Sequence, residues 1–494
     1  TINYLEINNS QVFIFPDFSN DVEDDQSKVF HGGNVKLTAS LSKEILSCNS
    51  LEASIGTGKF VGKINFNIGR YDAAVKQGKT QFDRLDLARE SAKNIKWKAI
   101  ETLDKQLEIF EQHFTKRGGK LIWAEDAAQA IEAIVQICKE KNCKTLVKSK
   151  SMVTEEIHLN EAMKQHGIES IETDLGEYIQ QLDEEPPYHI VTPAMHKSKE
   201  DVAKLFADKL GTAPNLTPEQ LTQAARHTLR QKYTEAQVGI TGANFMIADT
   251  GSIAITENEG NARLSCAFPK VHIVVVGIEK VIPSLTDLGL FWPLLATYGT
   301  GQKITVYNSI VSGPRQPNET DGPEQMYVIL LDNGRTNILA DPIARESLYC
   351  IRCGACLNAC PVYKNIGGHS YETTYSGPIG KVITPHLQGM HDYKHLSYAS
   401  SLCGNCTEVC PIKINLHELL LHNRHEAVKS GESTLAERLS WKAWKQASLH
   451  RSMMNMGSGK IKNWVVNKIF KGWTLHHGHL NFSKKTFNEM WKRQ

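Results

Sequence analysis

The chain lacks any apolar run long enough to cross a membrane. Its 494 residues contain no uninterrupted apolar stretch near the roughly 18 residues of a membrane span. The first residues (TINYLEINNSQVFIFPDFSNDVEDDQ) show no basic segment followed by an apolar one, so we expect no signal peptide. The formal net charge is only +2, which gives no reason to expect a nucleic-acid partner. These absences predict a folded cytoplasmic protein, in a reducing compartment that preserves free thiols.

Common cofactor and hydrolase signatures are absent too. No Gly-x-Gly-x-x-Gly motif follows a first strand, and no Gly-x-Ser-x-Gly elbow occurs. The chain therefore shows no fingerprint for a bound flavin or nicotinamide.

Cysteine, in contrast, is concentrated in one region. Seven of the 11 cysteines form two runs, Cys350-x2-Cys353-x2-Cys356-x3-Cys360-Pro361 and Cys403-x2-Cys406-x3-Cys410-Pro411. The first run has the spacing of bacterial iron–sulfur ferredoxins, in which the fourth cysteine ligates the other cluster. Two clusters are therefore predicted. Cluster 1 is a [4Fe–4S] cluster on Cys350, Cys353, Cys356 and Cys410, and cluster 2 is held by Cys360, Cys403 and Cys406.

The second run is one cysteine short. A complete copy would have cysteine at position 400, where the chain has Ser400. Two types of cluster 2 remain open: [3Fe–4S], or [4Fe–4S] with a fourth ligand from Ser400, Ser401, His395, His369 or water. Structural zinc is the main alternative to iron–sulfur, because Cys-x2-Cys pairs also bind zinc. Seven cysteines do not divide into four-cysteine sites, which favours iron–sulfur.

The chain is long enough for two or three domains. A long amphipathic helix over about 82–116 is followed by alternating strands and helices, including a strand over 188–192, and then by β-rich segments. This order predicts an α/β domain with a mainly parallel sheet over 66–340. Residues 341–429 contain the cysteines and few β-branched runs, which predicts a helical ferredoxin-type domain. Residues 1–65 are an N-terminal extension of unknown role.

Residues 430–494 form a basic tail, predicted to be helical. Between Arg438 and Gln494 the only acidic residue is Glu489, and five of the chain's 8 tryptophans fall in this tail. Such a segment can lie on an anionic membrane surface or dock a partner. The alternative is a tail that packs across its own protein.

The segment 147–156 is a candidate small-molecule site. It has the pattern of a strand, a short loop and a helix start, and ligands of open α/β sheets bind at the carboxyl ends of strands. Lys148 and Lys150 would favour a carboxylate or phosphate there. In the alternative interpretation, Ser151 or Thr154 simply caps the helix and Glu155 complements its dipole.

A second polar stretch follows at 239–263. Glycine, asparagine and aspartate at strand ends usually form turns. However, Asp249, Glu259, Asn261 and Arg263 flank apolar strands, which suits the rim of a pocket.

Several segments resemble a known family. They are Leu146–Met152, Gly239–Phe245, Asn258–Asn261, Pro269–Ile273, Asp332–Arg335, Asn337–Pro342, Gly367–Tyr371, Gly377–Gly380 and both cysteine runs. Over about 80–494 the chain resembles the lactate utilization protein B family, iron–sulfur proteins of a bacterial three-component lactate oxidation system. The resemblance implies a domain similar to the CoA-transferase and sugar-isomerase-like α/β group, followed by a helical two-cluster ferredoxin domain. It also implies a role in oxidising L-lactate to pyruvate with two partner proteins.

These observations support two main hypotheses. In the first, the chain is an electron-transfer subunit of an L-lactate oxidoreductase complex. In the second, it is a catalytic subunit that binds lactate or another small carboxylate through Lys148, Lys150 and Arg263, with Glu155 or Glu259 as the base. A third hypothesis, structural clusters in a nucleic-acid-binding protein, would show salt-dependent nucleic-acid binding.

Overall fold

The computed structural model describes most of the chain. The described residues are 2–8, 11–16, 28–32, 35–42, 45–55, 58–61, 63–450, 452–453, 457–469, 478–479, 481–485 and 490–491. Parts of the predicted extension and of the tail therefore lie outside them. Residues 1–425 form one compact unit and residues 426–494 a second. Among the described residues, no helix is both long and apolar enough for a membrane span.

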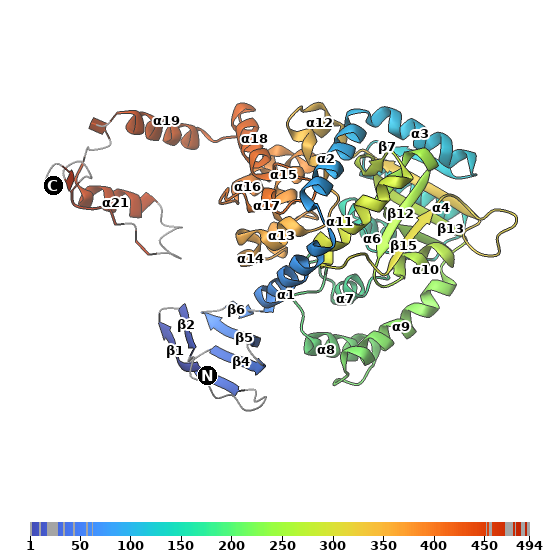
Figure 1. Cartoon of the computed structure of the whole chain (residues 1–494), viewed down its shortest axis with the longest axis horizontal. Coiled ribbons are helices and arrows are strands. Elements are labelled where there is room, and N and C mark those ends of the chain that lie inside the picture. The colour runs from blue at the N-terminus through green and yellow to red at the C-terminus, as the bar shows by residue number, and fades with distance from the viewer. Residues whose placement is uncertain are drawn as a thin grey trace. The chain divides into compact units, whose positions relative to one another are not determined.

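A six-stranded sheet, parallel throughout, organises the first unit (Figure 1). This confirms the mainly parallel α/β domain predicted from the sequence. In spatial order its strands are β7 (Lys120–Ala124), β16 (Gln325–Leu331), β13 (Val271–Gly277), β10 (Val238–Thr241), β8 (Thr145–Lys148) and β9 (Glu169–Glu172).

Both faces of this sheet are covered, as is usual for parallel sheets. Strand β13 is buried at every residue, and its alternate side chains enter two different apolar clusters. Ile273 and Val275 pack with helices α4 (Ala127–Glu140), α5 (Met152–Glu156) and α6 (Leu159–Gln165). Val274 and Val276 face helix α3 (Leu103–Lys116) and a second sheet.

The second sheet has four strands in the order β14 (Val281–Ile282), β11 (Phe245–Ile247), β12 (Ser252–Glu257) and β15 (Tyr307–Val311). Helices α2 (Leu85–Glu101), α3 and α11 (Leu288–Thr300) pack in the same core. The long helix predicted over 82–116 is divided at Thr102, whose backbone leaves the helical region at φ −121° and ψ 33°.

Three further helices flank the sheet, α7 (Leu175–Asp183), α8 (Lys199–Leu210) and α9 (Pro218–Glu235). The predicted strand over 188–192 is wrong, because the structure has bends over 188–191 and no strand there. His189 Nδ1 accepts hydrogen bonds from the backbone N–H groups of Val191 and Thr192, at 3.0 and 3.3 Å. These local bonds curl the segment and prevent it from pairing with a strand.

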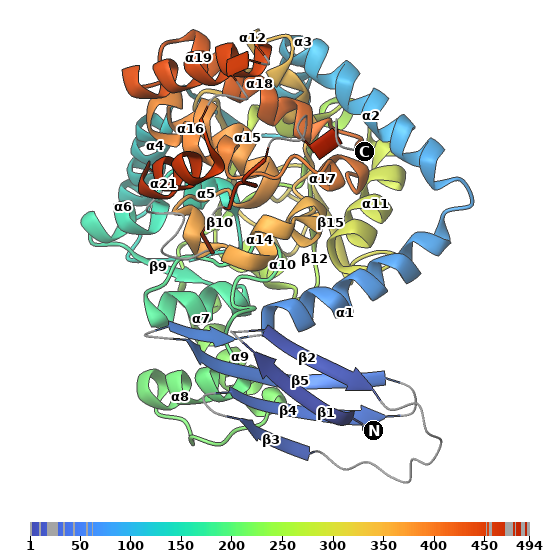
Figure 2. The ribbon, with the colours of Figure 1, turned by 90° about the vertical axis from the view of Figure 1, so that its left-hand side faces the viewer.

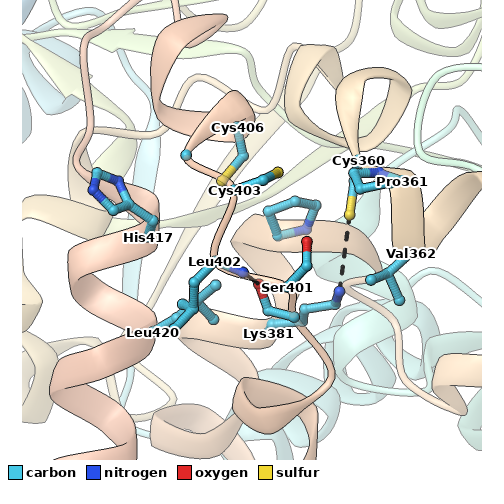
Figure 3. A pocket seen from close by; sticks show the side chains of 13 residues that line it. Cys360, Pro361, Val362, Lys381, Ser401, Leu402, Cys403, Cys406, His417 and Leu420 are labelled. Atoms are coloured by element: carbon cyan, nitrogen blue, oxygen red, sulfur yellow. Dashed lines mark hydrogen bonds between the residues drawn. The ribbon is translucent and has the colours of Figure 1, made fainter. Parts of the chain in front are cut away.

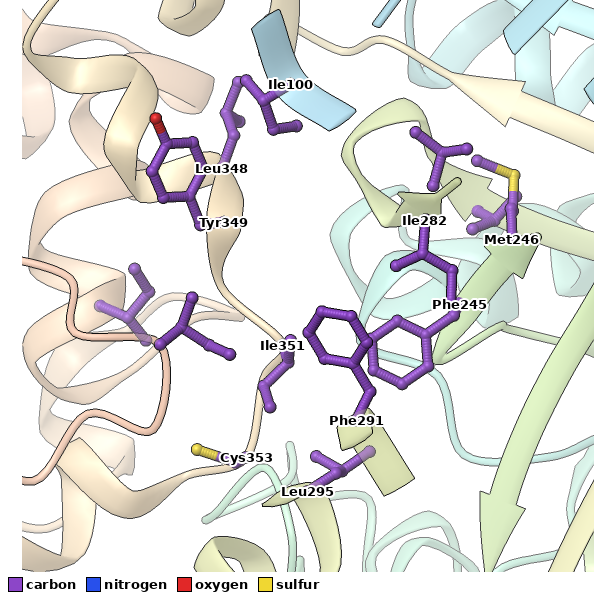
Figure 4. Packing of buried hydrophobic residues seen from close by; sticks show 14 of the residues in the cluster. Ile100, Phe245, Met246, Ile282, Phe291, Leu295, Leu348, Tyr349, Ile351 and Cys353 are labelled. Carbon is purple, nitrogen blue, oxygen red and sulfur yellow. The ribbon is translucent and has the colours of Figure 1, made fainter. Parts of the chain in front are cut away.

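The cysteine region is helical. Its elements are α12 (Arg335–Ala340), the 3₁₀ helices η5 (Ala344–Tyr349) and η6 (His369–Tyr371), α13 (Ala355–Ala359), α14 (Pro361–Ile366), α15 (Gly377–Gln388), α16 (Met390–Tyr398), α17 (Asn405–Glu408) and α18 (Leu416–Lys429). One apolar cluster joins it to the α/β region. In Figure 4, Ile351 lies next to Phe291, which packs on Phe245 with ring centroids 5.1 Å apart.

The N-terminal residues form antiparallel strands and one helix, α1 (Lys63–Gly78). Strands β1 (Ile2–Asn8) and β2 (Gln11–Pro16) pair with each other. A four-stranded sheet contains β3 (Lys28–Gly32), β4 (Val35–Ser42), β5 (Ile45–Ile55) and β6 (Gly58–Val61) (Figure 2). The second unit contains helices α19 (Leu435–Leu449) and α21 (Gly459–Ile469).

Candidate cluster sites and the adjoining cavity

The fold gathers four cysteines from the two runs into one buried group. Cys353, Cys356 and Cys410 are each 8% exposed, and Cys350 is half-buried. Burial raises the pKa of the Cys353, Cys356 and Cys410 thiols, that of Cys410 to about 12. The neighbouring thiols of the group raise these three pKa values further. Without a bound metal these thiols would stay protonated, whereas iron would hold them as thiolates. The group therefore suits a metal cluster better than a solvated nucleophile.

The other three cysteines border a small cavity nearby (Figure 3). Burial raises the pKa of Cys406 to about 11, while the backbone N–H of Asn405 lowers the pKa of the exposed Cys403 thiol. The Lys381 ammonium donates to Cys360 Sγ at 3.9 Å. This group is more open than the first, and a cation contacts one of its sulfurs.

Only some of the predicted fourth ligands reach this cavity. Ser400 and Ser401 line it. His369 and His395 do not: His369 Nε2 lies 2.9 Å from the Pro186 carbonyl oxygen, and His395 Nδ1 lies 2.9 Å from the Asp392 carbonyl oxygen. Of the predicted protein ligands, the two serines are therefore the ones placed beside the sulfurs.

The donor sets fit two iron–sulfur clusters. The first offers four sulfurs, and the second offers three sulfurs and nearby hydroxyl oxygens. A sharp turn follows Cys353 in the first run and Cys403 in the second, at Gly354 and Gly404, whose φ angles of 80° and 78° suit glycine.

A larger cavity of about 380 Å³ borders the first cysteine group. Its wall includes residues that follow strands β8 and β10, at the carboxyl ends where open α/β sheets bind ligands. Cys353 also lines it, as do Arg352, Lys280 and Tyr375. The cavity therefore borders both the sheet and the first cysteine group.

Both cations and carboxylates line this cavity. Burial and the neighbouring Arg352 lower the pKa of Lys280 to about 8. Lys150 donates to Asp174 Oδ2 at 3.1 Å and to the Val191 carbonyl oxygen at 3.0 Å. Although burial opposes its charge, Asp174 helps to raise the pKa of Lys150. Three basic side chains (Lys150, Lys280 and Arg352) are thus available to a small anion.

The pKa values of two carboxyl groups in the lining are also shifted. Burial raises the pKa of Glu257 and Glu259, and Asp174 raises that of Glu259 further. A carboxylate with a raised pKa is a stronger base than an ordinary carboxylate, which suits a general base.

Only some of the residues predicted to bind a small molecule line this cavity. Lys150, Glu259 and Asn261 line the cavity. Lys148 does not: it is fully buried, and its ammonium lies 2.8 Å from Glu155 and 2.7 Å from Glu172. Asp249 accepts hydrogen bonds from the backbone N–H of Leu285 at 3.0 and 3.2 Å, and Arg263 is exposed; neither lines the cavity.

Sequence reasoning missed Lys280, Arg352 and Tyr375 as cavity residues. Arg352 lies between the predicted ligands Cys350 and Cys353, and this position could have identified it as a residue near the cluster. No sequence signal identified Lys280 or Tyr375, because their burial depends on contacts between distant segments.

A buried ion network supports this region. Arg335 donates to Glu156 through Nη1 and Nη2, at 2.9 and 2.7 Å, and to Glu279 through Nε at 2.7 Å. The Tyr375 hydroxyl donates to Glu156 at 2.6 Å, and Arg352 Nη2 lies 3.6 Å from Glu279. The network thus ties two cavity residues of the cysteine region to the α/β region.

Comparisons with known proteins agree with this architecture. Residues 107–331 match the LUD domain, and residues 346–414 match the 4Fe-4S dicluster domain. A DUF162 family protein from Deinococcus radiodurans, of known crystal structure, is 13% identical with a TM-score of 0.27, over 47% of this chain and 98% of that one. The dicluster match supports iron–sulfur clusters in the cysteine region.

Curated relatives cover most of the chain. Lactate utilization protein B of Bacillus licheniformis is 44% identical over 419 residues, covering 82% of this chain and 88% of the relative. The protein of the same name from Bacillus subtilis is 44% identical over 453 residues, covering 84% and 94%. That from Bacillus velezensis is 47% identical over 372 residues, covering 75% and 78%. At this identity and coverage, the chain belongs to the lactate utilization protein B family.

Proposed function

We propose that this protein is the iron–sulfur electron-transfer subunit of a multi-protein system that oxidises L-lactate to pyruvate. Family membership supports lactate as the substrate of the system, since the relatives are named for lactate utilization. One observation carries the electron-transfer role: Cys353 of the first cysteine group lines the large cavity, whereas Cys403 of the second group is exposed. The first group thus borders the large cavity, and the second reaches the protein surface.

The chain's own side chains would set the properties of the two sites. Cys350, Cys353, Cys356 and Cys410 would hold one cluster, and Cys360, Cys403 and Cys406 the other. Clusters bound there would supply one-electron acceptors, whose potentials depend on ligands, hydrogen bonds to sulfur and burial. The Lys381 ammonium beside Cys360 would stabilise the reduced state of a cluster at the second site, because reduction makes the cluster more negative. At the first site, Lys280 and Arg352 interact electrostatically with Cys350.

The proposed partners are two other lactate-utilization proteins in the cytoplasm. The tail offers a further contact. On helices α19 and α21, Trp441, Trp444 and Trp464 are 60%, 62% and 65% exposed, among lysines. We propose that this basic, aromatic tail touches an anionic membrane surface peripherally.

A second candidate function is direct binding of lactate in the large cavity. The cavity combines three basic side chains with Glu259, whose pKa is raised, next to Cys353. In this version Lys150, Lys280 and Arg352 bind the carboxylate and Glu259 accepts the hydroxyl proton. The same chain would then be a catalytic subunit.

One experiment separates the two functions. The full chain is purified anaerobically, and EPR spectra are recorded before and after L-lactate, with and without the partner proteins. Cluster reduction only when partners are present supports the electron-transfer subunit. Cluster reduction by lactate without the partner proteins would show that this chain is the catalytic subunit. No cluster reduction, with or without the partners, would refute both proposed functions.

A binding assay tests the cavity itself. Lys280→Met should weaken lactate binding measured by calorimetry, if the cavity binds lactate. The matched control is Lys270→Met, whose ammonium is 79% exposed and lies 3.5 Å from Glu324 on the surface. Equal affinities for both variants and the unaltered chain would exclude the cavity as the lactate site.

A further inference from the structure

The two cysteine runs are copies of one another in sequence. The same interval separates Cys353 from Cys403, Cys356 from Cys406, and Cys360 from Cys410. At that interval, Ser400 is the counterpart of Cys350. If the two runs also share one backbone conformation, the Ser400 side chain must occupy the place that Cys350 has in the first run.

The backbone does repeat. Arg352 and Leu402, the residues before the second cysteine position of each copy, have φ angles of 60° and 54°. Non-glycine residues rarely adopt this left-handed region, so its occurrence at both equivalent positions is specific. The glycines that follow each cysteine have nearly equal angles, φ 80° and ψ −5° for Gly354 and φ 78° and ψ −9° for Gly404. A short helix starts directly after each glycine.

The side-chain atom at the repeated position makes the same hydrogen bond in both copies. The backbone N–H of Arg352 donates to Cys350 Sγ at 3.4 Å. The backbone N–H of Leu402 donates to Ser400 Oγ at 3.1 Å. Ser400 Oγ is therefore held on the loop as the sulfur of Cys350 is, and Ser400 lines the cavity with Cys360, Cys403 and Cys406.

Two long basic side chains also fix the backbone around Ser400. Arg424 donates from Nη2 to the Ser400 carbonyl oxygen at 3.2 Å and from Nε to the Ser397 carbonyl oxygen at 3.0 Å. Lys381 donates to the carbonyl oxygen of Ala399. A ligand position that is preorganised in this way loses little conformational entropy when it binds metal.

The other polar groups of the cavity have different roles. At the interval that relates the two runs, Ser401 is the counterpart of Ile351 and not of a cysteine. His417 Nδ1 lies 2.7 Å from Thr407 Oγ1, and its Nε2 lies 3.5 Å from Glu418. Ser400 is thus the group in the described lining that matches the missing cysteine.

We propose that Ser400 Oγ is the fourth protein ligand of cluster 2, which is then a [4Fe–4S] cluster with three sulfur ligands and one oxygen ligand. This inference rests on the proposed assignment of the cysteines. On binding, an Oγ–Fe bond forms and the O–H bond breaks, and the proton passes to solvent at the half-buried loop. No electron is gained or lost in this step.

Oxygen ligation has consequences for this corner of the cluster. An alkoxide is a harder ligand than a thiolate, so it favours the ferric state and lowers the potential of the cluster. The corner lies beside the exposed Cys403, where water can compete for the iron. The serine therefore makes the fourth iron of cluster 2 the one most readily lost.

Three variants of the full chain, purified anaerobically, test the proposal by iron content, Mössbauer spectra and EPR. Ser400→Ala should lose about one iron per chain and show a three-iron EPR signal as isolated. Ser400→Cys should keep the iron content of the unaltered chain and shift the midpoint potential of cluster 2 upward. The matched control Ser401→Ala should keep both the iron content and the four-iron spectra.

Several results would overturn the assignment. They are a three-iron signal in the unaltered chain, equal iron content in Ser400→Ala and the unaltered chain, or a loss of iron in Ser401→Ala alone. Circular dichroism shows whether each variant is folded, and Ser400→Cys keeps the test valid if Ser400→Ala does not fold. None of these readouts uses lactate or partner proteins, so the ligand assignment can fail while the proposed electron-transfer function stands.

Discussion

Replacing Arg335 with methionine should destabilise the protein strongly, because its guanidinium joins two buried carboxylates. Arg335, Glu156 and Glu279 have side chains only 1% exposed. Methionine fills a similar volume but neutralises neither carboxylate. Arg352 Nη2 stays 3.6 Å from Glu279, so Glu156 is the carboxylate left without a cation.

The expected loss can be worked out. Removing one partner of a buried ion pair costs about 3–5 kcal/mol. Unfolding entropy is about 2.1 cal/mol/K per residue, which gives roughly 0.9 kcal/mol/K for the compact unit of residues 1–425. The melting temperature should therefore fall by about 3–6 °C. Arg335→Lys should lie in between, because lysine keeps the charge but cannot form the bidentate pair.

The assay is anaerobic thermal unfolding of the cluster-containing protein, followed by far-ultraviolet circular dichroism. Arg315→Met is the matched control, since Arg315 is 36% exposed and lies 4.0 Å from Glu324. A surface pair of this kind contributes about 0–1 kcal/mol, so the control should melt within about 1–2 °C of the unaltered chain. Equal melting temperatures for the two methionine variants would refute the reasoning.

Three further predictions concern other parts of the chain. Burial raises the pKa of the Glu177 carboxyl group well above its usual value. The folded state therefore keeps a proton that the unfolded state releases above about pH 4.5, and the free energy of unfolding falls as the pH rises from there. Glu177→Gln should therefore melt higher than the unaltered chain at about pH 8 and by a smaller margin at about pH 5.5, whereas the exposed control Glu161→Gln should show no such trend. Gly239→Ala should abolish folding, because its Cβ would lie 1.9 Å from the Ser265 carbonyl oxygen, while Gly289→Ala, with nothing within 4 Å, should be tolerated; soluble yield distinguishes them. Lys442→Ala in the exposed helix α19 should weaken binding to phosphatidylserine vesicles about fivefold, since one lysine near such a surface contributes about 1 kcal/mol; unchanged co-sedimentation would exclude this helix as the membrane contact.

The parallel sheet and the dicluster region could be predicted from local sequence patterns. The run over 271–277 is apolar at nearly every position, which identifies a strand buried on both faces, and the structure places it at the centre of the sheet. The cysteine spacing identified the iron–sulfur region because a cluster needs ligands at short, regular intervals, and the dicluster match covers the same residues. In both cases the information lies within a few consecutive residues.

The roles of individual polar residues depended on the tertiary structure. Lys148 and Lys150 are two residues apart and looked equivalent, yet Lys148 ends strand β8 among buried glutamates while Lys150 reaches the cavity from the loop. Tyr188 and its neighbours have strand-like composition, but the His189 ring bonds their backbone into bends. Lys280 and Tyr375 reach the cavity from segments far apart in the chain. Spacing along the chain therefore identified the iron–sulfur region, whereas long-range packing decided which polar side chains face the cavity, because their burial and charge partners come from distant segments.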